Sequence, residues 1–502
     1  MTRERDYIRI GKMTHVPKEQ KDRGHGWFYQ RPGIGRLMEG REPFDTYEPR
    51  IPDYWGYHLF DVVHVIMLTE QEVIPREIGV QLLKALKEME REGIDDARKK
   101  AGGVAHSGEA YLIQRLGWDV GGYIHAGRSS NDLAPTYRRV QQRHFLLDVA
   151  DALNDLRAAL LTLAEELVNT IVPEYTVIQH ARPMTLGYLF EAWVNMLERN
   201  FTRFELAYKH TNISPMGSTD GTGSDFPLNL NRTAELAGFD DVFKNGLDVT
   251  YYSIRDEDTE TYALLRMITD VTASIGETLQ LWCSYEFRMA EIADRYAATS
   301  SIMSQKKNPG VHTLIRAAKT IRALGFSGDN IDAALRETIN SLRYTKGLLM
   351  TTTWNAQRMR ELCEYGFTCN ASLCRILVQE KGLPWRTAHQ ITAIMARKAH
   401  ELGMQMRDVT PEFLDECATE YVGYGKPLQL SIKTLKDAWN IEKNVANQDT
   451  HGGTAPVRVL EQIAISHKIL KQDQRSIKTK REKLAIAAQK RERAINALIE
   501  KT

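Results

Sequence analysis

The chain has 502 residues, of which 42% are hydrophobic and 26% are charged, an ordinary composition for a globular protein. Its 66 basic and 65 acidic residues leave a formal charge of +1, so electrostatics gives no case for nucleic-acid or membrane binding. Residues 1–12 lack the apolar stretch of a signal peptide, and the five cysteines include no CxxC pair. We therefore expect a cytoplasmic protein with reduced thiols.

The first fifty residues or so are rich in Gly, Pro and Arg, which predicts an irregular arm lying over a surface. Helical spacing begins near Tyr57. Three longer stretches, at residues 133–171, 186–208 and 261–295, repeat apolar residues every three or four positions, a pattern typical of helices that bury one face. Helices of this length exceed the usual mean of about 11–12 residues. The sequence therefore predicts an all-α protein built as an elongated bundle of long helices.

The same patterns divide the chain into four predicted parts. They are an N-terminal arm with a small helical domain (1–130), a central long-helix bundle (131–375), a small C-terminal helical domain (376–470) and a basic helical tail (471–502). From residue 468 to the end there are eleven Lys or Arg and only four Asp or Glu. We expect a solvated terminal helix there, with contact to an acidic partner or a neighbouring subunit as the alternative.

The strongest chemical signal is the segment TSSIMSQKKNP at residues 299–309. It combines two hydroxyls, two lysines and an asparagine, and such cations and amides can hold a carboxylate. They can also stabilise the dianion that forms when a proton leaves the carbon beside that carboxylate. A serine acts as the base only where positive charge and N–H groups favour its ionised form. From composition alone, a solvated linker is the alternative interpretation.

This segment resembles the signature loop of the aspartase/fumarase superfamily, G-S-S-x-M-P-x-K-x-N-P. The matching residues are Ser300, Ser301, Met303, Lys306, Asn308 and Pro309. Two further segments resemble the argininosuccinate lyase branch: IHAGRSSND at 124–132 is similar to H-T-G-R-S-R-N-D, and HGGTAPVRV at 451–459 is similar to its C-terminal G-G-T-A-P motif. The resemblance spans roughly residues 55–465, with the motifs in the family's order.

The resemblance implies a carbon–nitrogen lyase that acts by β-elimination on an N-substituted aspartate and releases fumarate and an amine. Argininosuccinate is the default substrate, and Ser300 maps to the family's base. The implied substrate contacts are Arg128, Ser129, Asn131, Thr176, Gln179, Ser301, Met303, Lys306 and Asn308. For Arg128, an ion pair with Asp132 that fixes the loop is the alternative.

The third motif departs from the family at one chemically important position. EYTVIQHARPM at 174–184 resembles G-Y-T-H-L-Q-x-A-Q-P, but Val177 stands where the family has the histidine that helps protonate the departing nitrogen. If the stretch were one helical turn, His180 would share a face with Val177, which makes His180 the candidate catalytic replacement. A packing or surface role for His180 is the alternative.

This departure widens the set of possible functions. The alternatives are a lyase for a different N-(dicarboxyethyl) amine or aminopolycarboxylate, and a catalytically silent, crystallin-like relative. The resemblance also implies a homotetramer with a central 20-helix core and active sites assembled from three chains. The long apolar stripes agree, since one chain cannot cover them all. No cofactor is implied, because the sequence has no phosphate or dinucleotide loop and no His/Asp/Glu cluster with metal-ligand spacing. The expected partners are a small dicarboxylate and further copies of the chain.

Overall fold

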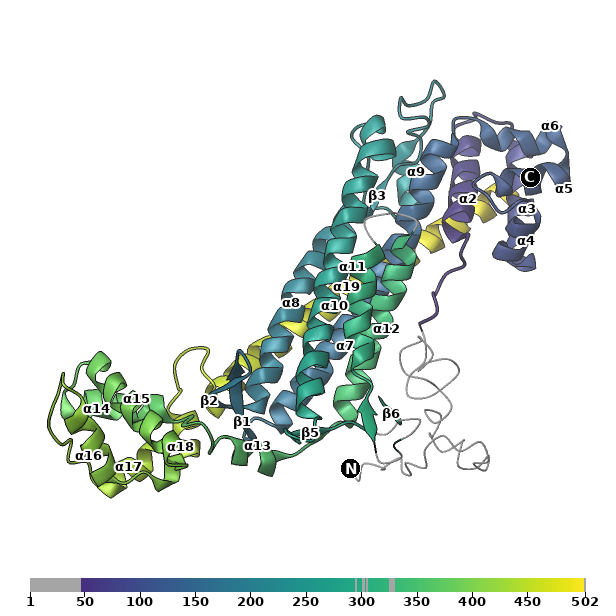
Figure 1. Ribbon diagram of the computed structural model, residues 1–502. Helices are drawn as coiled ribbons and strands as arrows, with labels where there is room; N and C mark the ends of the chain where they lie inside the picture. The colour runs from purple at the N-terminus through teal and green to yellow at the C-terminus, as the bar shows by residue number, and fades with distance from the viewer. Residues whose placement is uncertain (1–46, 294–295, 300–302, 304–305, 325–329, 501–502) are drawn as a thin grey trace.

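The computed structural model of the protein describes residues 47–293, 296–299, 303, 306–324 and 330–500. Helices dominate this part of the chain, and they form three regions in a row (Figure 1). A bundle of long helices occupies the centre, with a smaller helical region at each end. The prediction of an elongated, all-α long-helix bundle is confirmed.

The central bundle is built from six helices around one apolar core. They are α7 (Ser130–Glu166), α8 (Leu186–Thr211), α10 (Ser253–Trp282), α11 (His312–Leu324), α12 (Ile331–Thr351) and α19 (Pro456–Glu500). The predicted stripes are its core, with Leu146, Leu153, Ile268 and Ile275 fully buried. At a rise of about 1.5 Å per residue, α7 alone is about 55 Å long, so the two ends of the bundle are far apart.

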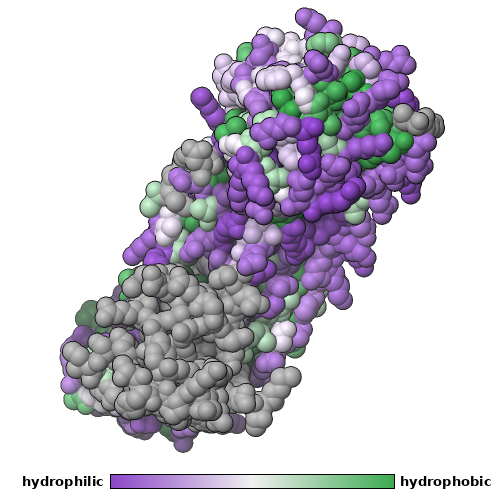
Figure 2. All heavy atoms as spheres, turned by 90° about the vertical axis from the view of Figure 1, so that its right-hand side faces the viewer, coloured by the Kyte–Doolittle hydropathy of each residue, from purple (hydrophilic) through white to green (hydrophobic). Residues whose placement is uncertain are grey.

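The N-terminal region packs around its own apolar core. Its elements are α2 (Trp55–Glu70), α3 (Arg76–Glu92), α4 (Ile94–Lys100), α5 (Ser107–Leu116), α6 (Trp118–Gly121) and the 3₁₀ turn η2 (Gly122–His125). Helix α9 (Leu230–Ala237) joins this core, as do Ile495 and Leu498 near the end of α19. Figure 2 shows apolar side chains gathered on the surface of this region, above a mostly hydrophilic face of the bundle.

The C-terminal region has a third core, which runs from Cys363 to Ile441. It contains α14 (Asn370–Lys381), α15 (Trp385–Glu401), the 3₁₀ turn η6 (Met406–Asp408), α16 (Pro411–Glu420), α17 (Ile432–Ala438) and α18 (Ile441–Ala446). The preceding helix, α13 (Ala356–Leu362), instead buries Met359 and Leu362 in the core of the central bundle. Among the described helices, none combines the length and apolarity that crossing a bilayer requires.

Short two-stranded ladders connect the helices. β1 (Ile171–Thr176) pairs with β2 (Gln179–Thr185), β3 (Ile213–Ser214) with β4 (Asp241–Val242), β5 (Ala290–Glu291) with β8 (Thr353–Trp354), and β6 (Ala297–Thr299) with β7 (Lys307–Pro309). A π-helical turn, η3 (Asp248–Tyr252), leads into α10. The β1–β2 hairpin explains why α7 ends at Glu166, short of the predicted residue 171. Likewise, α10 ends at Trp282, before the β5 strand.

The basic tail is not the solvated terminal helix expected from its composition. Helix α19 continues without interruption past residue 471 and lies back along the bundle (yellow in Figure 1). Its cations pair with acids of the same chain: Arg481 with Asp148 at 2.7 Å, and Lys480 with Glu205 at 2.6 Å. These ion pairs attach α19 to α7 and α8. Sequence periodicity does not reveal them, because the paired residues are far apart in the chain.

Glu191 gives the bundle a pH-dependent contact between α8 and α19. The Ser466 hydroxyl donates to its carboxyl at 2.6 Å, and burial, helped by nearby Glu198, raises the pKa of Glu191 to about 7 from 4.5. Between these two values the folded chain keeps the proton that the unfolded chain releases, so the free energy of unfolding falls as pH rises. The contribution of protonated Glu191 to the free energy of unfolding is therefore fully present below about pH 4.5 and is lost as pH rises toward 7.

We therefore predict that Glu191→Gln removes part of the loss of thermal stability between pH 5 and 7, because glutamine has no proton to release. The unfolding midpoint should be measured by calorimetry across this range. Glu166→Gln, an exposed position at the end of α7, is the matched control and should follow the wild-type profile. Parallel profiles for wild type and Glu191→Gln would contradict the prediction.

Candidate functional site

The motif segments lie at opposite ends of the central bundle. Segment 124–132 leads into the start of α7, beside the N-terminal region. The β1–β2 hairpin and the β6–β7 ladder lie at the other end of the bundle, and of the two it is the hairpin that lies near the C-terminal region (Figure 1). The length of α7 separates the two groups by about 55 Å. One chain alone therefore does not bring all the predicted site residues to one point.

Asp132 organises the end of the bundle where α7 begins. Ser129 and Asp132 form a capping box: the Ser129 side chain accepts from the Asn131 N–H at 3.3 Å, and Asp132 accepts from the Ser129 N–H at 2.9 Å. The other Asp132 oxygen accepts from the N–H groups of Gly217 at 3.1 Å and Thr219 at 3.3 Å. Burial raises the pKa of Asp132 to about 6 even though these three donors lower it. One buried side chain thus joins segment 124–132 to loop 214–229.

Arg128 is occupied by carboxylates of its own chain. Its side chain is buried and donates to Asp61 at 2.5 Å and to Glu109 at 3.2 Å. Arg98 donates to the same Asp61 carboxylate. Burial alone would raise the pKa of Asp61, but the two guanidinium groups lower it. This geometry favours the loop-fixing alternative for Arg128, with Asp61 rather than Asp132 as the partner.

The segment around Tyr175 is an antiparallel hairpin. Thr176 lies opposite Gln179, and both are exposed. Val177 and Ile178 form the two-residue turn with φ of 50° and 60°. Two-residue hairpin turns favour positive φ, but β-branched residues adopt it only with strain, and the sequence offers no Gly or Asn as a signal. Val177, 94% exposed, therefore stands at the tip of the hairpin.

The helical-turn argument for His180 is wrong, because a strand replaces the helix. His180 lies opposite Tyr175, not beside Val177. Its Nδ1 is 3.2 Å from the Tyr365 carbonyl, which can only accept, so Nε2 accepts from the Tyr175 hydroxyl at 3.0 Å. Burial raises the pKa of Tyr175 to about 12, which keeps that hydroxyl protonated. One ring nitrogen of His180 therefore binds Tyr175 within the hairpin, and the other binds the backbone at Tyr365.

The signature segment forms a loop with a β-ladder at its neck. The backbone of residue 298 pairs with Asn308 and that of residue 299 with Lys307. Met303 and Lys306 are exposed, and the Lys306 N–H donates to the Met303 carbonyl at 3.1 Å. Ser300 and Ser301 lie outside the described residues. A cleft of about 680 Å³ lies beside the neck, lined among others by the cationic residues Arg288, Lys306 and Lys307.

The C-terminal motif braces the hairpin. The Thr454 hydroxyl accepts from the Thr185 N–H at 2.9 Å, and the Tyr188 hydroxyl donates to the Gly452 carbonyl at 3.1 Å. Gln448 donates to the Pro183 carbonyl at 2.9 Å. Residues 448–454 therefore position β2 and the start of α8. Motif matching found this segment, but its contacts are visible only in the structure.

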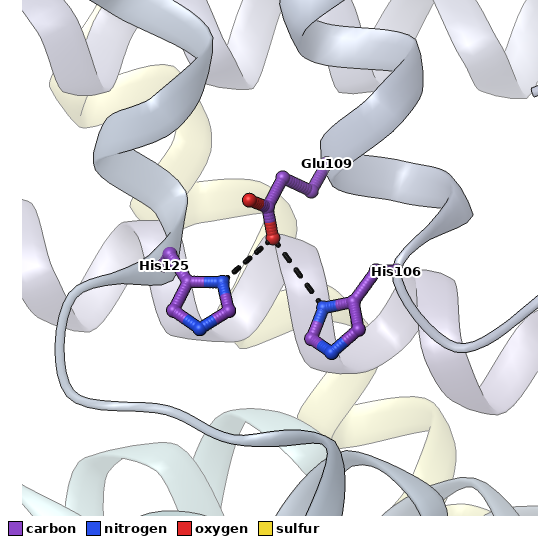
Figure 3. A group of neighbouring side chains, drawn as sticks. All are labelled: His106, Glu109 and His125. Carbon is purple, nitrogen blue, oxygen red and sulfur yellow. Dashed lines mark hydrogen bonds and ion pairs between the residues drawn. The ribbon is translucent and has the colours of Figure 1, made fainter.

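Folding also assembles a candidate metal-ligand group that the sequence analysis did not single out. His106, Glu109 and His125 meet where α5 and η2 are adjacent (Figure 3). One Glu109 carboxylate oxygen is 3.3 Å from His106 Nδ1 and 2.8 Å from His125 Nδ1. The H-x-x-E spacing of the first two residues was a local signal, whereas the third ligand comes from a separate element. The sequence analysis had found no cluster with metal-ligand spacing, because His125 joins the other two residues only in the folded chain.

Comparisons with known proteins agree with this fold and these motifs. The family model described as "Lyase" matches residues 65–324, and the one described as "Argininosuccinate lyase C-terminal" matches residues 371–446. The argininosuccinate lyase of Methanocaldococcus jannaschii is 33% identical over 448 residues, covering 85% of this chain and 90% of that protein. That of Methanosphaera stadtmanae is 32% identical and covers 80% and 90% respectively.

Solved structures show the same architecture. A variant of EDDS lyase with bound fumarate superposes with a TM-score of 0.80 at 26% identity, covering 89% of this chain and 92% of that one. The 3-carboxy-cis,cis-muconate lactonizing enzyme of Pseudomonas putida, at 17% identity and a TM-score of 0.64, shares the fold. The long-helix bundle and its motif loops thus define a lyase of the fumarase/aspartase type. Within that class, the chain belongs to the argininosuccinate lyase family.

We predict that Asp132→Asn lowers the free energy of unfolding by about 1–3 kcal/mol, because an amide has one acceptor oxygen and cannot serve Ser129 and the 217–219 backbone together. Thermal unfolding measures the loss. Asp225→Asn, an exposed carboxylate in the same loop, is the control, with an expected change within about 0.5 kcal/mol. Equal midpoints for the two variants would contradict the role assigned to Asp132.

Proposed function

We propose that this protein is a carbon–nitrogen lyase that cleaves argininosuccinate by β-elimination into arginine and fumarate, in arginine biosynthesis. Family membership and the 33% identity to an argininosuccinate lyase support the reaction. The observation that carries the proposal is the ladder of β6 and β7. It closes the motif segment into one loop, with Ser300 and Ser301 in the segment it encloses and Asn308 on the returning strand.

The chemistry requires charge stabilisation more than a strong base. Ser300 takes a proton from the carbon beside a carboxylate, and the resulting dianion then expels the amine as the C–N bond breaks and the double bond of fumarate forms. The leaving nitrogen takes up a proton. Lys306 lies exposed beside a cleft that Arg288, Lys307 and Glu291 also line. Lys307 pairs with Glu291 at 3.1 Å, so the proposal assigns the positive charge near the dianion to Lys306 and Arg288. Preorganised cations of this kind stabilise developing negative charge.

The remaining substrate contacts divide into two sets. Ser301, Met303 and Asn308 belong with Lys306 on the signature loop. Thr176 and Gln179, the last pair before the hairpin turn, and Ser129 and Asn131, at the start of α7, offer neutral hydrogen-bonding groups. Arg128 lies behind the second set, where its pairing with Asp61 holds the loop in place.

A homotetramer brings these sets together, since they are held at opposite ends of the bundle in each chain. Four copies of five long helices would form the 20-helix core that the family resemblance implies. Large apolar side chains exposed on the described bundle helices support this packing: Leu206, Met267, Leu281 and Met350. The five free cysteines fit a reducing compartment, and we place the enzyme in the cytoplasm.

One observation favours a second candidate substrate class. Val177 at the hairpin tip cannot donate a proton to a leaving nitrogen, and His180 is held by Tyr175 and Tyr365. A leaving amine with less need of protonation tolerates this arrangement. The structural likeness to EDDS lyase points the same way, toward other N-(dicarboxyethyl) amines or aminopolycarboxylates. The fumarate-forming half of the reaction is the same in both cases.

We predict that the purified enzyme releases fumarate from argininosuccinate, detected by ultraviolet absorbance, and that Ser300→Ala lowers kcat by at least about 100-fold. Ser304→Ala, on the same loop but outside the motif's hydroxyl pair, should retain most activity. Fumarate from other N-succinyl amines but not from argininosuccinate would select the second substrate class. Absence of fumarate from all of them would indicate a catalytically silent relative.

We predict complementation between variants at the two ends of the bundle. Asn131→Ala and Lys306→Ala should each be nearly inactive, because each damages every site in a homotetramer. Mixed tetramers, made by unfolding and refolding the two together, should recover part of the activity, since some sites then receive both intact loops from different chains. The control is each variant refolded alone. A fully active monomer in light scattering would contradict the shared site.

A further inference from the structure

The cluster of His106, Glu109 and His125 lies outside the residues used in the proposed reaction. His106 immediately precedes α5, Glu109 lies in the first turn of α5, and His125 ends η2. Figure 3 shows the Glu109 carboxylate between the two imidazole rings. One ligand atom from each residue lies within 4.8 Å of the others. Both imidazoles present their Nδ1 atoms to the same carboxylate oxygen.

This geometry is close to that of a metal site. Zinc binds imidazole nitrogen and carboxylate oxygen at about 2.0–2.2 Å in tetrahedral geometry, which places neighbouring ligand atoms roughly 3.4 Å apart. The measured separations from the Glu109 oxygen, 3.3 Å to His106 and 2.8 Å to His125, need only small adjustments. Two imidazoles and one carboxylate also match the ligand set of sites that keep one position open for water.

His106 supplies a second indication. Its Nδ1 atom is buried and has no hydrogen-bond partner among the described residues, although it lies 3.3 Å from a carboxylate oxygen. Two lone pairs facing each other at this distance repel unless a proton or a cation lies between them. Because the same Glu109 oxygen is also close to His125, a single cation there contacts all three groups.

Arg128 limits how tightly such a cation binds. Its guanidinium donates to the same Glu109 oxygen at 3.2 Å and neutralises part of its charge. The His125 side chain is half exposed, at 51%, so solvent can reach this side of the cluster. These features describe an accessible site that is weaker than a closed structural zinc site. Imidazole ligands favour the later transition metals over Mg²⁺ or Ca²⁺, which prefer oxygen.

We propose that His106, Glu109 and His125 bind a divalent transition-metal ion of the Zn²⁺ type. The ion cross-links the start of α5 to the end of η2. The last residue of η2, His125, lies three positions before Arg128 in the sequence. It thereby stabilises the segment that leads into the α7 cap at Ser129. This role is independent of the proposed elimination, because no step of that reaction passes through the metal.

The test uses the full-length protein after treatment with a chelator, titrated with Zn²⁺ by calorimetry. We expect one Zn²⁺ per chain in the wild type and at least tenfold weaker binding in the double variant H106Q/H125Q, which keeps the Glu109–Arg128 pair. The matched control is His210→Gln. His210 also lies against a glutamate, Glu260 at 2.7 Å, but the described residues offer no second histidine there, so binding should be unchanged.

Thermal unfolding gives a second measurement. Zn²⁺ should raise the unfolding midpoint of the wild type and of His210→Gln but not of the double variant, because only a ligand of the native state stabilises it by mass action. If the double variant fails to fold, His125→Gln replaces it, with the same expected loss of binding. Equal Zn²⁺ binding by wild type and variants, or none above background, would overturn the proposal. Fumarate release is assayed separately, so failure here leaves the proposed reaction untouched.

Discussion

The rise of an α-helix, about 1.5 Å per residue, is the constraint on which the function of this protein depends. Helix α7 places the capped loop at Ser129 about 55 Å from the hairpin that follows its last turn. The proposed elimination uses residues of both loops, so a second copy of the chain has to supply one of them. In the proposed mechanism, the long bundle keeps the two sets of site residues apart within one chain, so catalysis depends on the proposed assembly of chains.

Buried charge holds each loop in place within the chain. At the start of α7, Asp61 takes two guanidinium groups while Asp132 takes three backbone N–H groups, and neither carboxylate is exposed. A buried carboxylate costs free energy unless all its hydrogen-bonding and charged partners are in place. These two carboxylates therefore favour a single arrangement of the loop. Arg128 is an example. The motif resemblance suggests that it binds substrate, but in the folded chain its guanidinium pairs with Asp61.

The hairpin tip shows the opposite situation, a strained and exposed element. Val177 and Ile178 both adopt positive φ without the Gly or Asn that would make this easy. Strain of this kind persists only where the surroundings maintain it, and here Tyr175, His180 and the C-terminal motif do so. Exposed Val177 stands at the position of the family's histidine, and this difference is the basis of the second substrate class proposed above.

Sequence periodicity determined the long helices of this protein, since apolar spacing along α7, α8 and α10 is a local property of the chain. The residue types in segment 299–309 likewise indicated carboxylate chemistry. Only the tertiary structure decided that residues 171–185 form a hairpin, that Arg128 pairs with Asp61, that α19 lies along the bundle, and that His106 and Glu109 meet His125. These features depend on contacts between residues distant in sequence, whose proximity follows from the path of the folded chain and from no local pattern.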